Sequence, residues 1–176
     1  MDIRPGDPAA SSLSFVASLA VYRTIRSFLP DADMLLKWPN DVLVSDAKIC
    51  GILLDRVRDK VVAGIGVNIN IAPEVDGREV TCLVDEGASV GVAEFLQTLS
   101  SEFASSVGIW RERGLLQILD QWQMLAHPVG AAITTSDEGG DKISGEYAGL
   151  TADGALRLRK ADGTLIEIRA GDISIG

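Results

Sequence analysis

The sequence predicts an α+β protein in which a mixed, largely antiparallel sheet packs with helices and is followed by a small β-barrel. Two observations predict this fold class. Stretches with apolar residues at helical spacing bracket a group of short apolar runs that are separated by turns, and from Val129 onward only short strand-like runs cut by glycines remain. We therefore expect two domains, over residues 1–127 and 128–176, with the boundary at the AHPVG segment.

Composition and charge narrow the class of protein. The chain has 176 residues, of which 47% are hydrophobic, and can bury a core of ordinary size. Its net charge of −9 argues against DNA as a partner, because duplex binding needs clustered Lys and Arg. No apolar run approaches the roughly 20 residues of a membrane-spanning helix and the start MDIRPGDP lacks a signal-peptide core, so we expect a cytoplasmic protein with no membrane partner. Cys50 and Cys82 show neither zinc-site nor disulfide spacing and are expected to be inert core residues.

A first amphipathic helix is expected to run to about Phe28, before Pro30, with Ser11 or Ser12 as its N-cap. Its apolar positions recur at helical spacing: Leu13, Val16, Leu19, Ala20 and Ile25. Four apolar runs follow and are expected to form adjacent antiparallel strands, at 34–38, 41–44, 48–57 and 61–70.

Two further helices and a set of short strands complete the expected fold. The segment 91–114 places an apolar stripe at helical spacing, and Gly114 is expected to interrupt it before a second helix that ends near residue 126. The stripe consists of Val92, Phe95, Leu96, Leu99, Phe103 and Val107. In the C-terminal region, ALRLRKADGTLIEI alternates apolar and polar residues across an Asp-Gly turn, which is typical of a β-hairpin.

Residues 34–44 read MLLKWPNDVLV and indicate a polar site at a turn. Pro39 fixes the backbone and removes a donor, so the turn is stiff. Lys37, Asn40 and Asp41 bring a cation, an amide and a carboxylate to this turn. Few structural needs explain that set of residues between two strands.

Two glycine motifs follow in the next two runs. Gly51 lies in the middle of KICGILLD, where a missing side chain costs stability unless something must approach the backbone closely. Gly64, Gly66 and Asn68 form a GxGxN pattern in a strand, without the helix and third glycine of a dinucleotide-binding loop. A Rossmann site is therefore excluded.

In this order, the three motifs KWPND, Lys-x-x-Gly-Ile-Leu and Gly-Ile-Gly-x-Asn resemble the catalytic core of biotin protein ligases. The segments GEYAGLTADGALRL and AGDISIG resemble the small SH3-like domain that follows this core. The resemblance implies a class II synthetase-like catalytic fold. It also implies an ATP-dependent ligase that converts biotin and ATP, with Mg²⁺, to biotinyl-5'-AMP and then modifies a lysine of the biotin carboxyl carrier protein of acetyl-CoA carboxylase or a related carboxylase.

The resemblance also implies roles for individual residues. Lys37 would be the catalytic residue, since a lysine can offset the charge where two anions are joined. The implied biotin-binding residues are Lys37, Trp38, Gly51, Ile52, Leu53, Gly64 and Gly66. The implied nucleotide-binding residues are Lys37, Asn40, Asp41, Lys48 and Asn68, with Asp41 or Asn68 as the magnesium ligand.

Plainer readings of these residues stay open. Ordinary turn hydrogen bonding explains Asp41 equally well, and Lys48 would then be an exposed surface lysine. Gly51 could be a packing glycine, and Trp38 fits a core position or a pocket wall better than a catalytic role. His127 lies beside Pro128 without a patterned nucleophile, which favours a structural role.

The chain departs from the family before the first helix. Biotin protein ligases carry an early strand and a GRGRxGR loop there, and the repressor-type ligases also carry a winged helix-turn-helix; this sequence contains none of these. We therefore expect an N-terminally truncated catalytic domain with weak turnover, and an unpaired sheet edge that a partner, such as a second copy in a homodimer, would cover. The alternatives are a non-catalytic remnant that binds biotin or the carrier, and a lipoate-type acyl-adenylate ligase.

Overall fold

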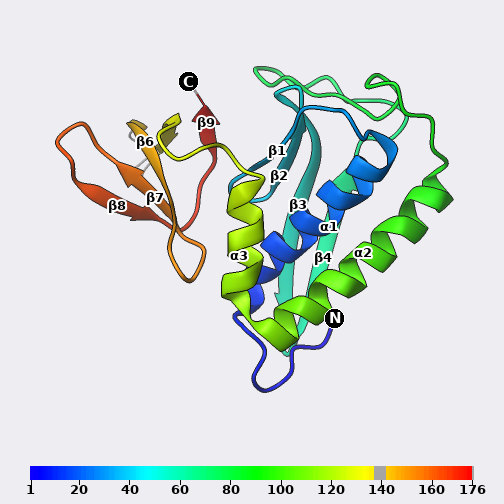
Figure 1. Cartoon of the computed structure of the whole chain (residues 1–176), viewed down its shortest axis with the longest axis horizontal. Coiled ribbons are helices and arrows are strands. Elements are labelled where there is room, and N and C mark those ends of the chain that lie inside the picture. The colour runs from blue at the N-terminus through cyan, green and yellow to red at the C-terminus, as the bar shows by residue number, and fades with distance from the viewer. Residues whose placement is uncertain (137–141, 176) are drawn as a thin grey trace.

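The computed structural model describes residues 1–136 and 142–175 and contains two antiparallel sheets with three α-helices (Figure 1). The first part of the chain comprises a 3₁₀ helix Ala10–Ser12, α1 (Leu13–Phe28), β1 (Met34–Lys37), β2 (Asp41–Val44), β3 (Ala47–Val57), β4 (Lys60–Val67), α2 (Val92–Arg113) and α3 (Leu115–Met124). The second comprises β5 (Ala132–Ser136), β6 (Lys142–Leu150), β7 (Leu156–Arg159), β8 (Leu165–Ile168) and β9 (Ile173–Ile175).

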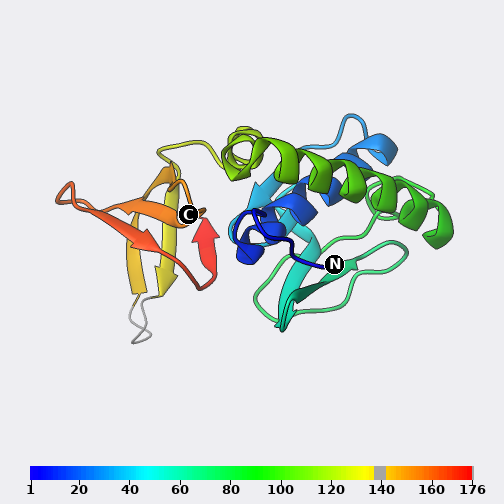
Figure 2. The same cartoon turned by 90° about the horizontal axis from the view of Figure 1, so that it is seen from below.

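The first sheet has the strand order β1-β2-β3-β4, and every neighbouring pair is antiparallel. The predicted set of adjacent antiparallel strands is therefore confirmed, as is common for consecutive strands that short turns connect. Helix α1 covers one face of this sheet, and α2 and α3 lie beyond α1 (Figures 1 and 2). In the described part of the chain, no helix covers the opposite face (Figure 2).

Helix α1 is buried on more sides than its sequence pattern predicts. Residues between the expected apolar positions, such as Ala17, Val21 and Thr24, are also fully buried. The reason is that α1 lies between the sheet and the pair α2–α3 (Figure 2). Ser12 occupies the N-cap position, but its side chain does not cap the helix: the hydroxyl donates to the Ala9 carbonyl and accepts from Trp110 Nε1 at 2.8 Å.

The second helical segment is divided at Gly114, as predicted. Gly114 adopts a φ of 81° between α2 and α3, a conformation that favours glycine. The predicted stripe on α2 is only partly buried: Phe95, Leu99 and Val107 pack in the core, whereas Val92 and Leu96 are exposed. The buried residues are those that meet α1, so the stripe is narrower than the sequence pattern indicates.

The second sheet has the strand order β8-β7-β6-β5-β9, and its β7–β8 hairpin turns at Gly163 with a φ of 84°. Together the two sheets and three helices confirm the predicted α+β class with largely antiparallel sheets. Residues 137–141 and 176, which the predicted C-terminal domain includes, lie outside the described residues. The division at 127/128 stays a prediction. None of the described helices is both long and apolar enough to cross a membrane.

Candidate active site

Residues from all three sequence motifs lie side by side across the first sheet. The strand register pairs Lys37 with Asp41, Asp41 with Gly51, and Gly51 with Gly66. Because directly paired residues share a face of a sheet, this row brings a cation, a carboxylate and two glycines to the face opposite α1. We call these four residues the motif row. Motifs that are separate in the sequence thus form one continuous surface.

The turn between β1 and β2 is fixed to β3 by Asn40. Its side-chain Nδ2 donates to the Ile52 carbonyl at 2.5 Å, and the Ile52 N–H donates to the Asn40 carbonyl at 3.0 Å. The amide donor of Asn40 is therefore used within the protein. Its effect is to hold the end of β1, and with it Lys37, against the neighbouring strands.

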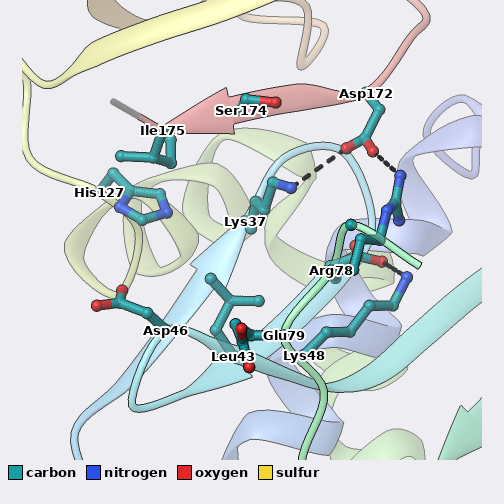
Figure 3. A pocket seen from close by; sticks show the side chains of 12 residues that line it. Lys37, Leu43, Asp46, Lys48, Arg78, Glu79, His127, Asp172, Ser174 and Ile175 are labelled. Atoms are coloured by element: carbon teal, nitrogen blue, oxygen red, sulfur yellow. Dashed lines mark hydrogen bonds and ion pairs between the residues drawn. The ribbon is translucent and has the colours of Figure 1, made fainter. Parts of the chain in front are cut away.

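Lys37 points into a cavity of about 480 Å³ between the two sheets, which we call the Lys37 cavity (Figure 3). Its side chain is only 16% exposed, and its Nζ lies 3.3 Å from Asp172 Oδ1. Arg78 pairs with the other oxygen of the same carboxylate. His127 lines the same cavity. The cavity therefore places two cations where an anionic ligand group would be held.

Lys48 and Asp41 form an ion pair of 2.6 Å on the same face. Lys48 reaches this face because the β2–β3 register shifts, leaving Ile49 as an extra residue between the paired Lys48 and Cys50. A Cβ on Gly51 would lie 3.0 Å from Lys48 Nζ, so the missing side chain gives the ammonium its space. This contact accounts for a glycine in mid-strand without a ligand. Lys48 is 29% exposed and paired with Asp41, and its role at a nucleotide stays a prediction.

Beyond the ion pair, glycines open a groove along β3 and β4. Gly51, Gly64 and Gly66 line it together with the exposed side chain of Leu53; we call it the glycine groove. Ile52 lines it only through its backbone, because its side chain is buried in the core on the other face. The Lys48–Asp41 pair borders both the glycine groove and the Lys37 cavity and so lies between them.

Trp38 lies away from the motif row. It is buried, and its indole Nε1 donates to the carbonyl of Gly154, in the turn between β6 and β7, at 3.1 Å. It packs where Trp122, Tyr147 and Leu156 also meet. Trp38 therefore joins the two sheets, and we do not retain it among the biotin-binding residues.

Asn68 anchors the segment that follows β4. Its Nδ2 donates to the Thr81 carbonyl at 2.9 Å, and its own N–H donates to the Ile49 carbonyl at 2.9 Å. Asn68 lines a further hollow beside Gly51 and Gly66, to which Arg78 also contributes. The side chain thus fixes the segment 68–83 against the edge of the groove.

The predicted magnesium ligands do not form a metal site by themselves. The carboxylate of Asp41 is 6% exposed and already neutralised by Lys48, so it does not fit a Mg²⁺ ligand in this arrangement. The described residues contain no group of three or more His, Cys, Asp or Glu that could hold a metal ion. Any magnesium would therefore depend on oxygens of a bound nucleotide.

The sequence analysis missed Arg78 and Asp172 as site residues. Neither belongs to a motif, and no sequence signal brings residue 172 to residue 37. His127 is buried, which favours the predicted structural role; burial lowers its pKa, and its Nε2 has no hydrogen-bond partner among the described residues. Burial raises the pKa of Cys50 to about 12, which favours the predicted inert thiol, and Cys82 is buried too.

Comparison with known proteins gives the family of this chain. Residues 4–71 match the biotin/lipoate A/B protein ligase family, and residues 130–176 match the biotin protein ligase C terminal domain. The biotin–acetyl-CoA-carboxylase ligase of Paracoccus denitrificans is 34% identical over 188 residues, covering 99% of this chain and 78% of that relative. The Mycobacterium tuberculosis ligase of the same name is 30% identical, covering 92% of this chain and 61% of that protein.

Solved structures agree in fold. The biotin protein ligase from Aquifex aeolicus in complex with biotin and ATP has a TM-score of 0.81 at 24% identity, covering 95% of this chain and 72% of that one. The family models and the curated relatives therefore define a ligase class. Within it, the chain belongs to the biotin protein ligase family. It spans 56% of the Escherichia coli bifunctional ligase/repressor BirA, so it matches only part of the longer relatives.

Proposed function

We propose that this protein activates biotin with ATP to biotinyl-5'-AMP and transfers the biotinyl group to a lysine of a biotin carboxyl carrier protein. The motif row carries the proposal, because it places Lys37, the Asp41–Lys48 pair and the glycines on one surface. The family relationship supports the choice of biotin. Because the reaction consumes ATP, the cytoplasm is the compartment that we propose for it.

The two hollows on the open face suit the two substrates. The glycine groove offers exposed backbone and the apolar Leu53 to the biotin ring, because glycines allow close approach of a ligand. The Lys37 cavity is lined by Lys37, Lys48 and Arg78 as well as by four carboxylates, and its volume lies within the roughly 300–1000 Å³ typical of small-molecule sites. Its three cations are the groups that would contact the phosphates. The carboxylate of biotin and the α-phosphate would then meet beside the Asp41–Lys48 pair.

Lys37 supplies the main chemical function in this arrangement. A biotin carboxylate oxygen attacks the α-phosphorus, pyrophosphate leaves, and the carrier amine later displaces AMP while losing a proton to solvent. The first step joins two anions, so a fixed ammonium lowers its barrier by offsetting their repulsion and the charge that develops on phosphorus. Lys48 adds a second cation, and Asp41 holds it in place.

Asn40 and Asn68, the remaining residues of the predicted nucleotide site, hold the segments that carry the cations in place. Asn40 fixes the turn that carries Lys37, and Asn68 fixes the segment that carries Arg78. We propose that magnesium arrives bound to the ATP phosphates, since Mg²⁺ prefers oxygen ligands and usually retains few from protein. No step here depends on a protein ligand for the metal.

Removal of the Lys37 ammonium tests this proposal. We expect Lys37→Met to lower the rate of biotin incorporation into a purified carrier domain by about 100- to 1000-fold, the range seen when one charge-stabilising group is lost. The control is Lys60→Met, which removes an equally charged but exposed lysine of the same sheet. Equal rates for wild type and Lys37→Met would contradict the assignment of Lys37.

The two alternatives give different results. A non-catalytic remnant would bind biotin with the same affinity whether or not ATP is present, whereas formation of the adenylate locks both ligands together; calorimetry of biotin with and without ATP separates them. A lipoate-type ligase, which the shared biotin/lipoate family model admits, would transfer lipoate in preference to biotin in the same carrier assay.

A further inference from the structure

The carboxylate of Asp172 lies where the two cations of the Lys37 cavity converge (Figure 3). Its Oδ1 is 3.3 Å from Lys37 Nζ, and its Oδ2 pairs with Arg78. Lys37 ends β1 of the first sheet, Arg78 lies between β4 and α2, and Asp172 directly precedes β9 of the second sheet. One carboxylate therefore ties together three separate parts of the chain.

Two cations that converge on one anion define an anion-binding position. A carboxylate offers them two oxygens, as a phosphate group does, and both kinds of anion form charge-assisted hydrogen bonds with Arg and Lys. Asp172 occupies the position without being buried, since its side chain is 45% exposed. Water screens such an exposed pair, so an incoming anion of higher charge can displace it at low cost.

The backbone of Asp172 is held independently of its carboxylate. Thr135 Oγ1 donates to the Asp172 carbonyl at 2.9 Å, and the next residue, Ile173, pairs with Thr135 in the sheet. The carboxylate also accepts a hydrogen bond of 2.9 Å from the Ile173 N–H through Oδ1, and this local bond does not involve either cation. Strand β9 can therefore stay in its sheet when the side chain leaves the cations.

We propose that Asp172 is a stand-in for a phosphate group of the nucleotide. In the free protein the Asp172 carboxylate holds the Lys37 and Arg78 side chains close together. When the nucleotide binds, its phosphate replaces the carboxylate and contacts both Lys37 and Arg78. Displacement of Asp172 also breaks the Arg78–Asp172 ion pair, which connects the segment 68–83 to the residue before β9. That the ligand is a nucleotide rests on the proposed function; the competition between two anions for one pair of cations does not.

Calorimetry of ATP binding to the full chain at low salt tests the competition. Asp172→Asn keeps the shape of the side chain but removes its charge, so we expect ATP to bind about fivefold more tightly, the effect of losing an exposed ion pair. Arg78→Met should weaken ATP binding about tenfold because a phosphate partner is lost. Adenosine, which has no phosphate, should bind all variants alike.

A matched variant separates this effect from net charge. Asp153→Asn makes the same charge change on the second sheet's domain, but its partner Arg169 does not line the Lys37 cavity. We expect no change in ATP affinity for this variant. An equal gain in Asp153→Asn would overturn the proposal, and so would an ATP affinity of Asp172→Asn that is unchanged or weaker.

Two further probes identify the anion. Tighter biotin binding by Asp172→Asn without tighter ATP binding would assign the position to the biotin carboxylate and overturn the phosphate assignment. Tripolyphosphate serves as a phosphate probe that lacks the adenine base. If Asp172→Asn binds neither ATP nor tripolyphosphate, the proposal is overturned. None of these measurements uses biotin transfer, so failure of the ligase proposal would appear separately, as absent incorporation into the carrier.

Discussion

Two neighbouring rows of the first sheet use the same four strands and have opposite composition. The row that faces α1 is apolar, and its first three members are at most 1% exposed: Leu36, Val42, Cys50 and Val67. One residue along each strand, the motif row carries two charges and two glycines on the open face. The alternation of side chains in a strand thus separates packing from chemistry. The effect of a substitution should depend on which row it enters.

We expect the largest loss of stability from a substitution on the packed face of the first sheet, and almost none from the matching substitution on its open face. Ile52 and Leu53 are consecutive in β3, yet their exposed fractions are 3% and 73%. We expect Ile52→Ala to lower the free energy of unfolding by about 2–5 kcal/mol, because it leaves a cavity under α1. Leu53→Ala should change it by about 0.5 kcal/mol or less. Urea unfolding measures both, and similar losses would show that the two faces are not separated in this way.

A smaller effect is expected from the charged face. Lys48→Met leaves the nearly buried Asp41 carboxylate without its cation, and we expect a loss of about 2 kcal/mol. This is less than for a fully buried pair because the Lys48 side chain is 29% exposed and partly screened. Adding Asp41→Asn to Lys48→Met should restore part of the stability. A double-mutant cycle with no coupling would contradict the pairing.

The smallest effect concerns His127, where the open face meets the second sheet. Burial lowers its pKa below the ordinary 6.5, so the unfolded chain takes up a proton at a higher pH than the folded one. The neutral side chain therefore supports folding above pH 6.5, and stability is lost as the pH falls below that value. Melting temperatures from pH 8 to pH 5 should fall less steeply for His127→Gln. Parallel curves would exclude this contribution.

Several strands, a hairpin and the break between two helices were predictable, because nearby turn residues and glycines determine them. The first two strands, predicted at 34–38 and 41–44, are found at Met34–Lys37 and Asp41–Val44 on either side of a short turn that contains Pro39, and the Asp-Gly pair at 162–163 fixes the β7–β8 hairpin. Gly114 divides the helices because its positive φ ends α2. The motif row was predictable only as a set of motifs in order; its alignment across four strands depends on the register, which the turns set.

The rest of the site depends on contacts between distant parts of the chain. The Lys37–Asp172 contact needs the second sheet to dock against the first, and no periodicity in the sequence encodes that orientation. Lys48 reaches the open face through the shift at Ile49, which has no sequence signature of its own. The width of the apolar stripe on α2 likewise depends on how α1 lies against it.

Adjacent residues at the end of β1 connect to different parts of the molecule. Lys37 extends into the cavity, while the indole of Trp38 donates a hydrogen bond to the Gly154 carbonyl in the β6–β7 turn. Since a single peptide unit joins the two residues, the hydrogen bond that anchors Trp38 to the C-terminal part of the chain also restricts the backbone next to Lys37.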